Sequence, residues 1–239
     1  QDGTTAQETI TIDNEIIVES ESEKLLGLKM SNDLRWNAHI ADLKTALNQR
    51  IAMLSRLAYS LTREQLIQFA HGMIISKIRY GIAIYGTIRT SESCPHDRPM
   101  TSLEVAINDV MRVIAGKRRR DGVSITQLQN ETKLPSANQL AIQAILTEAW
   151  KIQRGLSDSI EDLMTPIEER YIVTRAAAQG HVRIPMGGGR CSGSSFSHQA
   201  ATLWNDAPAQ IRDETKSSSA KKKNTRVHEN VSIITCPLF

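Results

Sequence analysis

The chain is poor in aromatic residues, which make up 4% of its 239 positions. β-Sandwiches depend on aromatic and β-branched side chains, so this composition disfavours them, whereas the abundant Leu, Ile and Ala suit a helical bundle. Hydrophobic residues still account for 40% of the sequence, which is enough for a core. We therefore expect one large domain, or a smaller one with appendages.

Cysteine is also scarce. Cys94, Cys191 and Cys236 are odd in number and far apart, which argues against a disulfide framework and for a reducing, intracellular compartment, nuclear or cytoplasmic. His181, Cys191 and His198 could be three metal ligands. No paired C-x-x-C or H-x-x-x-H accompanies them, so we expect no zinc site.

Motifs of catalysis are missing. The chain has no G-x-S-x-G, no H-E-x-x-H and no adjacent pair of aspartates of the kind that holds magnesium in two-metal polymerases. Gly187 to Gly189 could cradle a phosphate, but no G-K-[ST] follows, which favours a flexible linker. The first residue is Gln1 and no secretory signal follows, so we expect a piece of a longer protein.

The net charge of +3 is too small to argue for nucleic acid, so the distribution of charge matters more. Acidic residues crowd the first quarter, and basic residues gather in two runs, Lys117, Arg118, Arg119 and Arg120, and Lys221 to Lys223. Four cations at 117–120 would compensate a helix dipole and could contact phosphates. A charge run at a helix end can also be simply solvated. The residues alone do not decide between phosphate contact and solvation.

Two long helices are expected in the first half. From Trp36 the apolar residues recur every three or four positions, as in an amphipathic helix facing a core. The stripe consists of Ile40, Leu43, Leu47, Ile51, Leu54 and Leu57. Thr62 and Gln65 form a capping box that opens a second helix, and the run Leu66 to Ile88 is apolar on nearly every side. We expect an antiparallel pair whose second member is buried.

The run from Leu66 to Ile88 is about long enough to cross a bilayer. Lys77 and Arg79 fall near its middle, where each charge would cost several kcal/mol in hydrocarbon, so we reject a membrane span. The two cations either snorkel at the edge of a soluble core or contact phosphates. Both roles stay open.

Three later helices are predicted from capping signals. The pairs are Thr101 with Glu104, Ser124 with Gln127, and Ser136 with Gln139. Gly116 would end the first of these helices and Gly155 the last. Beyond Asp158 the pattern becomes irregular.

Extended segments precede the helices. Glu8 to Ile12 and Glu15 to Val18 alternate as strands around Asp13 and Asn14, which predicts a hairpin. Lys24 to Met30 predicts a third strand, in which Gly27 marks a bulge, a close approach of another backbone or merely a bend. The residues alone favour the bend.

Four stretches, in order along the chain, match motifs of one family. The first stretch consists of EKLLGLKM (23–30) and DLRWNAHI (33–40). It is similar to YLGVxLDxxLxWxxHI, with Leu25 in place of the tyrosine. IRYGIAIYG (78–86) is similar to xxPxLxYGxxxWG, and 103–116 to LxxxQxxxLRxIxG. SFSHQAATLWNDAP with IR (195–212) is similar to SFxxRAxxLWNxLPxxIR. Together they resemble the region after the palm in reverse transcriptases of non-LTR retrotransposons.

This resemblance implies roles for parts of the chain. The palm with its metal-binding aspartates would lie upstream, the LG strand would be the primer grip, and the following helices would be the thumb. Leu26 and Gly27 would then lie against the primer backbone, where an absent side chain permits close approach. We also predict that the run Lys117 to Arg120 lies beside Gly27 along a duplex groove. The expected nucleic-acid contacts are Leu26, Gly27, Lys77, Arg79, Lys117, Arg118, Arg119 and Arg120.

The expected fold is mainly α, a thumb-like helical bundle preceded by a small β-hairpin and strand element, with an irregular C-terminal tail. The expected boundaries are 1–30 for the β element, 31–165 for the helical domain, 166–216 for a linker with a short helical motif, and 217–239 for a disordered tail. The expected function is to hold a template–primer duplex of RNA and DNA as part of an RNA-directed DNA polymerase. Its partners would be that duplex and the palm and fingers of the same polyprotein, with no membrane.

No cofactor is expected in this segment, since magnesium would come only with the palm, and the chain alone is expected to be inactive. The alternative is a non-catalytic helical protein-interaction module, from a decayed or domesticated element.

Overall fold

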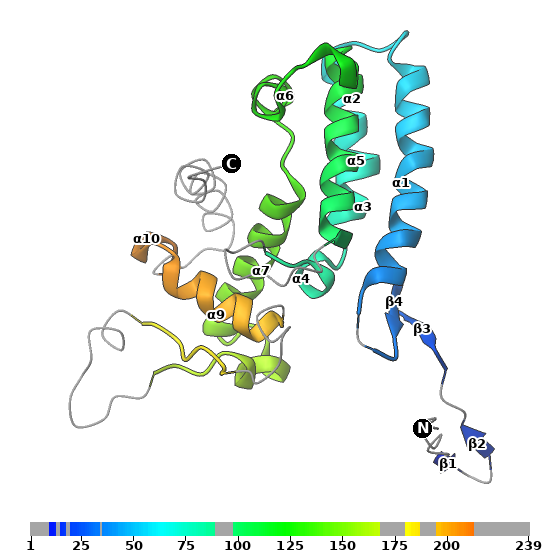
Figure 1. Cartoon of the computed structure of the whole chain (residues 1–239). Coiled ribbons are helices and arrows are strands. Elements are labelled where there is room, and N and C mark those ends of the chain that lie inside the picture. Colours follow the sequence, from blue (N-terminus) through cyan, green and yellow to red (C-terminus); the bar gives the residue numbers. More distant parts are fainter. Residues whose placement is uncertain are drawn as a thin grey trace, which may run out of the picture.

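The fold is mainly α, with two small antiparallel hairpins before the helices, as the composition predicts (Figure 1). The computed structural model describes residues 10–12, 15–17, 20–33, 35–88, 98–167, 180–186 and 195–212. The elements in the first half are β1 Ile10–Ile12, β2 Glu15–Ile17, β3 Ser22–Leu25, β4 Leu28–Ser31, α1 Asn37–Leu57, α2 Arg63–Ala70, η1 His71–Ile75, α3 Ser76–Arg79 and α4 Ile82–Tyr85. Those in the second half are α5 Arg98–Ala115, η2 Arg119–Asp121, α6 Ile125–Thr132, α7 Ala137–Gln153, η3 Asp158–Leu163, α9 Phe196–Asp206 and α10 Ala209–Arg212. The predictions for 217–239 and for Gly187 to Gly189 lie outside the described residues.

The first hairpin pairs β1 with β2, with Ile10 opposite Ile17, as predicted. The second hairpin corrects the prediction of a single strand over Lys24 to Met30, because β3 and β4 pair with each other and Leu25 faces Leu28. The chain turns back at Leu26 and Gly27, whose φ angles are 48° and 85°. Positive φ at both central residues belongs to the two-residue turn whose twist matches that of paired strands.

The stripe predicted for α1 is confirmed. Its 21 residues bury Ile40, Leu43, Leu47 and Leu54, and Ile51 and Leu57 pack half-buried against the same cluster. The principal neighbour of α1 is α5, which supplies its own buried row of Leu103, Ile107, Val110 and Met111. These side chains form the centre of a first core.

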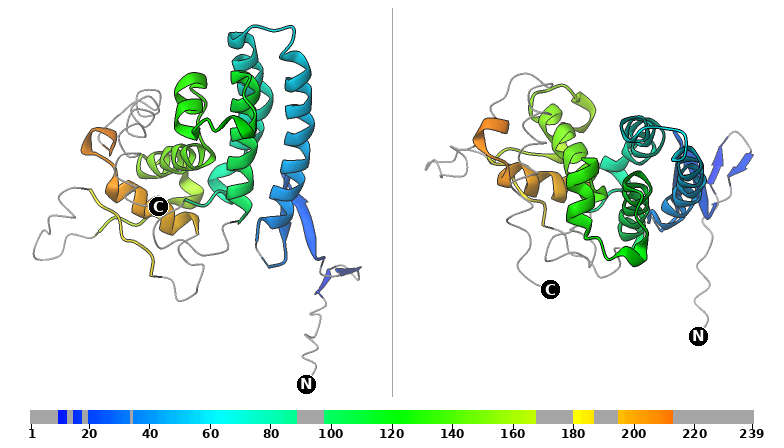
Figure 2. Two further views of the ribbon diagram at one scale, coloured as in Figure 1. Left: turned by 45° about the horizontal axis from the view of Figure 1, so that its top comes forward. Right: turned by 90° about the horizontal axis from the view of Figure 1, so that it is seen from above.

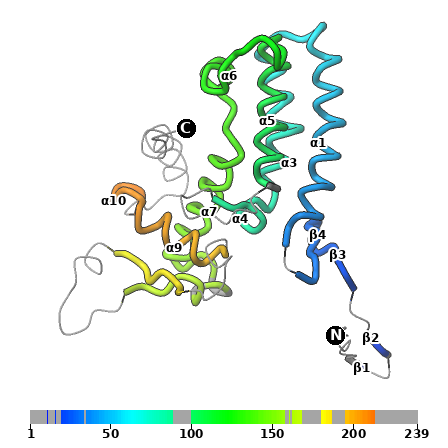
Figure 3. Tube along the Cα trace, in the orientation of Figure 1, coloured from blue at the N-terminus to red at the C-terminus, as the bar shows by residue number. Residues whose placement is uncertain are grey.

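The second predicted helix is interrupted twice. α2 begins with the predicted capping box of Thr62 and Gln65, widens into the single π-helical turn η1, and continues as α3. It then breaks at Tyr80 and Gly81, where φ is +70° at the glycine, and α4 starts anew. The prediction of one helix to Ile88 is therefore wrong beyond Tyr80. The path of this broken segment is followed most easily in the tube of Figure 3.

The prediction that this second helix is buried on all sides is also wrong. Ile74, Ile75 and Ile78 are buried, but the opposite side, from His71 to Met73 and at Ser76 and Lys77, is exposed. The neighbouring helices cover only one face because α1 and α5 pack from the core side. The exposed face bears a hollow, described below.

The third predicted helix begins earlier than its capping signal. α5 starts at Arg98, so Thr101 lies inside the helix and the predicted box with Glu104 is not its start. Glu104 instead accepts a hydrogen bond at 2.9 Å from the backbone N–H of Asn138, at the start of α7. The other predicted signals hold: Ser124 caps α6, Ser136 and Gln139 form the box of α7, and Gly116 and Gly155 follow α5 and α7 with positive φ.

α1, the α2–α3 segment and α5 pack together, with the α2–α3 segment running opposite to α1 and α5, and α7 and α9 lie across from them (Figure 2). A second core fills the space between α7 and α9 and includes Ile145, Trp150, Val182 and Trp204. Among the described helices, none combines the length and the apolar character needed to cross a membrane.

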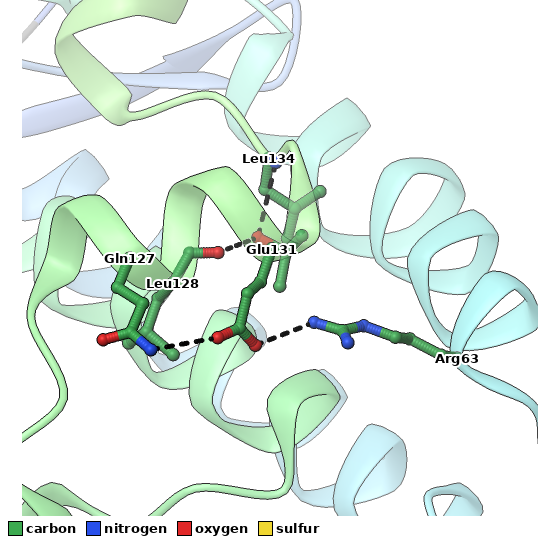
Figure 4. A network of polar contacts seen from close by, with 6 residues as sticks. Arg63, Gln127, Leu128, Glu131 and Leu134 are labelled. Carbon is green, nitrogen blue, oxygen red and sulfur yellow. Dashed lines mark hydrogen bonds and ion pairs between the residues drawn. The ribbon is translucent and has the colours of Figure 1, made fainter.

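Polar side chains join the beginning of α2 to α6 at one end of the molecule (Figure 4). Arg63 and Glu131 form an ion pair at 3.0 Å. Thr132 is fully buried; its hydroxyl donates to the carbonyl oxygen of Leu128 at 2.8 Å and accepts from the N–H of Leu134 at 3.5 Å. A buried hydroxyl satisfied in this way does not destabilise the core around it.

Candidate nucleic-acid interface

The tip of the second hairpin rests against the end of α3. The hydroxyl of Tyr80 donates a hydrogen bond of 2.5 Å to the carbonyl oxygen of Leu26. A Cβ atom placed on Gly27 would lie 3.5 Å from Cε1 of Tyr80. The structure thus brings the predicted residues Leu26 and Gly27 together with Tyr80, which the sequence analysis placed in a motif without giving it a role.

The turn conformation by itself explains the glycine. At φ +85° Gly27 occupies a region that other residues rarely adopt, and a Cβ atom there would make only an ordinary contact with Tyr80. Leu26 is different, because a bulky residue at positive φ costs about 1–2 kcal/mol relative to the right-handed or extended regions. Its side chain is 82% exposed.

An open hollow lies beside Tyr80, between α1 and the η1–α3 segment. It is lined by Arg50, Gly72, Met73, Ser76, Lys77 and Tyr80. Arg50 is half-buried and comes from the edge of the apolar stripe of α1, and the other five come from the exposed face of the second helix. The hydroxyl of Ser76 donates to the carbonyl oxygen of Gly72. The charged residues of this lining are Arg50 and Lys77.

The pKa of His39 on α1 is sensitive to the positive charges on this side of the molecule. Burial is the main cause that lowers its pKa, and the positive charges of Lys77 and Lys24 lower it further, against the opposing effect of Asp42. The Nδ1 atom of His39 accepts a hydrogen bond of 3.3 Å from the N–H of Lys29 in β4. Lys24 of the hairpin and Lys77 of α3 therefore both act on the same half-buried imidazole.

Lys77 and Arg79 do not share a face. Residues two apart on a helix point in different directions, and Lys77 lines the hollow whereas Arg79 does not. Arg79 acts instead on His71, whose pKa is lowered first by burial and then by the Arg79 charge. Of the two predicted cations, the hollow therefore holds only Lys77.

The predicted position of the run Lys117 to Arg120 beside Gly27 is wrong. The hairpin meets the start of α1, whereas the run follows α5 at the other end of the bundle, where α1 ends and α2 begins (Figure 1). The 21 residues of α1 separate the two by about 30 Å at 1.5 Å per residue.

The four cations of this run differ in their partners. Arg119 makes a two-point contact with Asp109, at 3.1 Å from Nε and 2.6 Å from Nη2, and this hydrogen-bonded carboxylate raises the pKa of Arg119. The backbone N–H of Arg118 donates to Asp121 at 2.6 Å, which closes the short η2 turn. The side chains of Lys117 and Arg120 are exposed.

The C-terminal motif that resembles the polymerase family serves to hold the second core together. The side chain of Asn205 pairs with the backbone of Val182, donating to its oxygen and accepting from its nitrogen, both at 2.9 Å. The indole N–H of Trp204 donates to the oxygen of Gly180 at 3.0 Å. Nη1 of Arg212 donates to three carbonyl oxygens at the end of α9, those of Trp204, Asn205 and Ala207.

A second open hollow lies beside this motif and includes Arg154, His181, Pro208 and Arg212. Its arginines are engaged within the chain, because Nη2 of Arg154 donates to the oxygen of Arg212 at 2.8 Å. In the described part of the chain no group of three or more His, Cys, Asp and Glu could hold a metal ion, and Cys191 lies outside that part.

No protein-family model, curated protein or solved structure matches this chain. Sequence reasoning missed Arg50, and it gave Tyr80 no role although this residue stands in one of the four motifs. Arg50 is one polar residue among many on α1, but Tyr80 stands immediately before the helix-breaking Gly81 and could have been found from that position.

Proposed function

We propose that the chain holds a template–primer duplex of RNA and DNA as the primer-grip and thumb part of a non-LTR retrotransposon reverse transcriptase. The nucleotidyl transfer would take place on a palm elsewhere in the polyprotein. The order of the four motifs supports this proposal. The observation that carries it is the meeting of the hairpin tip at Leu26 and Gly27 with the cationic hollow at Arg50 and Lys77.

The chemistry of this surface suits a phosphate backbone. Arg50, Lys77 and Lys24 come from three different elements, and no ion pair between described residues engages any of them. Cations without a carboxylate partner can meet phosphates and give affinity without reading sequence, which is what a thumb requires. Arg119, by contrast, already shares the carboxylate of Asp109 with Arg112.

The run Lys117 to Arg120 forms the second part of the proposed interface. It lies about 30 Å from the hairpin, the length of α1, which corresponds to about nine base pairs at 3.4 Å each. A duplex that touches both ends must be at least that long. Arg79, on its separate face, is peripheral in this arrangement.

The test is binding of the full chain to a 16-base-pair RNA–DNA hybrid over a range of salt concentrations. Arg50→Ala with Lys77→Ala should weaken binding and flatten the plot of log affinity against log salt by about 0.9 for each phosphate that the protein no longer neutralises. Lys44→Ala with Arg56→Ala is the matched control, because it removes the same charge from exposed positions of α1 that point at least about 120° away from Arg50.

The triple change of Arg118, Arg119 and Arg120 to alanine should reduce the slope for the 16-base-pair hybrid and leave it unchanged for a six-base-pair one. Equal slopes for the hollow variant and its control would contradict the proposal. Equal slopes for the triple variant and the unchanged chain would remove the run from it.

A protein-interaction module is the second candidate, and exposed apolar side chains favour it. Leu25, Leu26 and Ile84 are 61%, 82% and 58% exposed. A protein partner that covers them would gain mainly from buried apolar area, so its affinity would depend little on salt. Absence of hybrid binding at low salt would leave this candidate in place.

A further inference from the structure

Leu26 is an unfavourable residue for its position in the turn of the second hairpin. The turn of the second hairpin needs positive φ at both central residues, a geometry that favours Asn-Gly, Asp-Gly or Gly-Gly. Leu26 adopts φ +48° and also exposes 82% of its surface to water. Asparagine would avoid both costs, so neither the turn nor the hairpin pairing explains why a leucine stands there.

The tip that carries Leu26 has a fixed position. Tyr80 binds the carbonyl oxygen of Leu26 at 2.5 Å, and β4 is held on α1 by the bond from Lys29 to His39. Tyr80 is itself 56% exposed and lines the hollow together with the 43% exposed Met73. Tyr80 thus joins the tip that carries the exposed Leu26 to a hollow that Met73, Arg50 and Lys77 also line.

Apolar and aromatic groups beside cations suit unpaired nucleotides better than the outside of a duplex. A duplex presents phosphates and hides the faces of its bases, whereas an unpaired nucleotide offers its base to an aromatic ring and its phosphate to a cation. Leucine is also one of the residues that proteins insert between bases. A purely apolar protein surface would leave the two cations without a counter-charge.

We propose that the hairpin tip and the hollow bind unpaired nucleotides at the end of the duplex, with Leu26 and Tyr80 against the bases and Arg50 and Lys77 on the phosphates. This inference rests on the proposed function and specifies which part of the nucleic acid occupies this hollow. The remaining duplex extends along the bundle toward Lys117.

The test compares a blunt RNA–DNA hybrid with one that carries a three-nucleotide 3′ overhang containing the fluorescent base 2-aminopurine. The full chain should bind the overhang hybrid at least about fivefold more tightly, and the fluorescence should be quenched as the base stacks. Tyr80→Leu should abolish both effects, while Tyr80→Phe, which keeps the ring, should retain the quenching.

Leu26→Asn separates function from folding. Asparagine tolerates the turn, so the thermal midpoint should stay or rise, yet the preference for the overhang should fall. Equal affinity for both hybrids, with fluorescence unchanged by Tyr80→Leu, would overturn this inference and leave the proposed function intact. Failure of both hybrids to bind at low salt would overturn both.

Discussion

The two cores of this molecule are assembled by different interactions. The first, between α1, the α2–α3 segment and α5, consists of apolar side chains that recur with the period of a helix. The second, between α7 and α9, is also apolar and is closed in addition by polar side chains that bind the backbone of distant segments. Gln199 of α9, for example, accepts a hydrogen bond of 2.7 Å from the N–H of Ile88, 111 residues earlier. Both cores therefore depend on apolar volume, and the second depends in addition on a few directional bonds.

Removing apolar volume from the first core gives the largest expected effect. Leu47 is fully buried in the middle of α1, so Leu47→Ala should lower the free energy of unfolding by about 2–5 kcal/mol. Denaturant unfolding followed by circular dichroism measures this. Glu64→Ala, in the exposed first turn of α2, is the control and should cost only a few tenths of a kcal/mol. Equal losses from the two variants would show that the stripe is not a core.

Removing one directional pair from the second core should have a smaller effect. Asn205→Ala leaves the N–H and carbonyl of the buried Val182 without their partner, which should cost about 1–3 kcal/mol. Hydrogen exchange at the Val182 amide should also accelerate. Asp206→Asn, at the exposed neighbouring position, should change stability by less than about 0.5 kcal/mol. If exchange at Val182 stays as slow as in the unchanged chain, the pairing does not close this core.

The smallest expected effect is a dependence of stability on pH at the edge of the first core. Burial lowers the pKa of His39 below its ordinary value of 6.5, so the unfolded chain takes up a proton at higher pH than the folded chain. The stability that depends on neutral His39 is complete above about pH 6.5 and is lost as the pH falls below it. Protonation would also remove the acceptor of the Lys29 N–H.

Unfolding at pH 7.5 and at pH 5.5 tests this effect. His39→Asn retains an acceptor and removes the titration, so it should be less sensitive to pH than the unchanged chain. His71 shifts in the same direction, and both proteins should therefore be compared in a His71→Gln background. Identical pH profiles with and without His39 would rule out its contribution.

Local patterns predicted the first core well, because each of its helices has its own apolar period. The stripe of α1 and the caps at Thr62, Ser124 and Ser136 could be read from neighbouring residues. The second core could not, since the pairing of Asn205 with Val182 depends on which segments the tertiary fold brings together. The motif around Trp204 resembles a family motif, and the structure gives the polar groups of Trp204, Asn205 and Arg212 partners on the backbone.

The same distinction applies to the candidate site. The second hairpin was missed because Leu26 is not a turn residue, and the break in the second helix was missed because Gly81 stands in an apolar run. Sequence reasoning selected Gly27 and Lys77, but their proximity through Tyr80 is a tertiary fact. The position of Lys117 to Arg120 follows from the direction of α5 in the bundle, which no local pattern contains.

The π-helical turn η1 affects which changes of length the α2–α3 segment can tolerate during evolution. Leu66, Ala70, Ile74 and Ile78 are all buried although they are spaced by four, and in a regular helix that spacing would drift by about 120° over 12 residues. The extra residue in the π-helical turn absorbs the drift. Deletion of the exposed Gly72 would change the spacing to four, three and four, which suits an ordinary α-helix with the same residues inward. A one-residue deletion is therefore tolerated more easily at this turn than elsewhere in the segment, and it would reshape the floor of the hollow without disturbing the core beneath it.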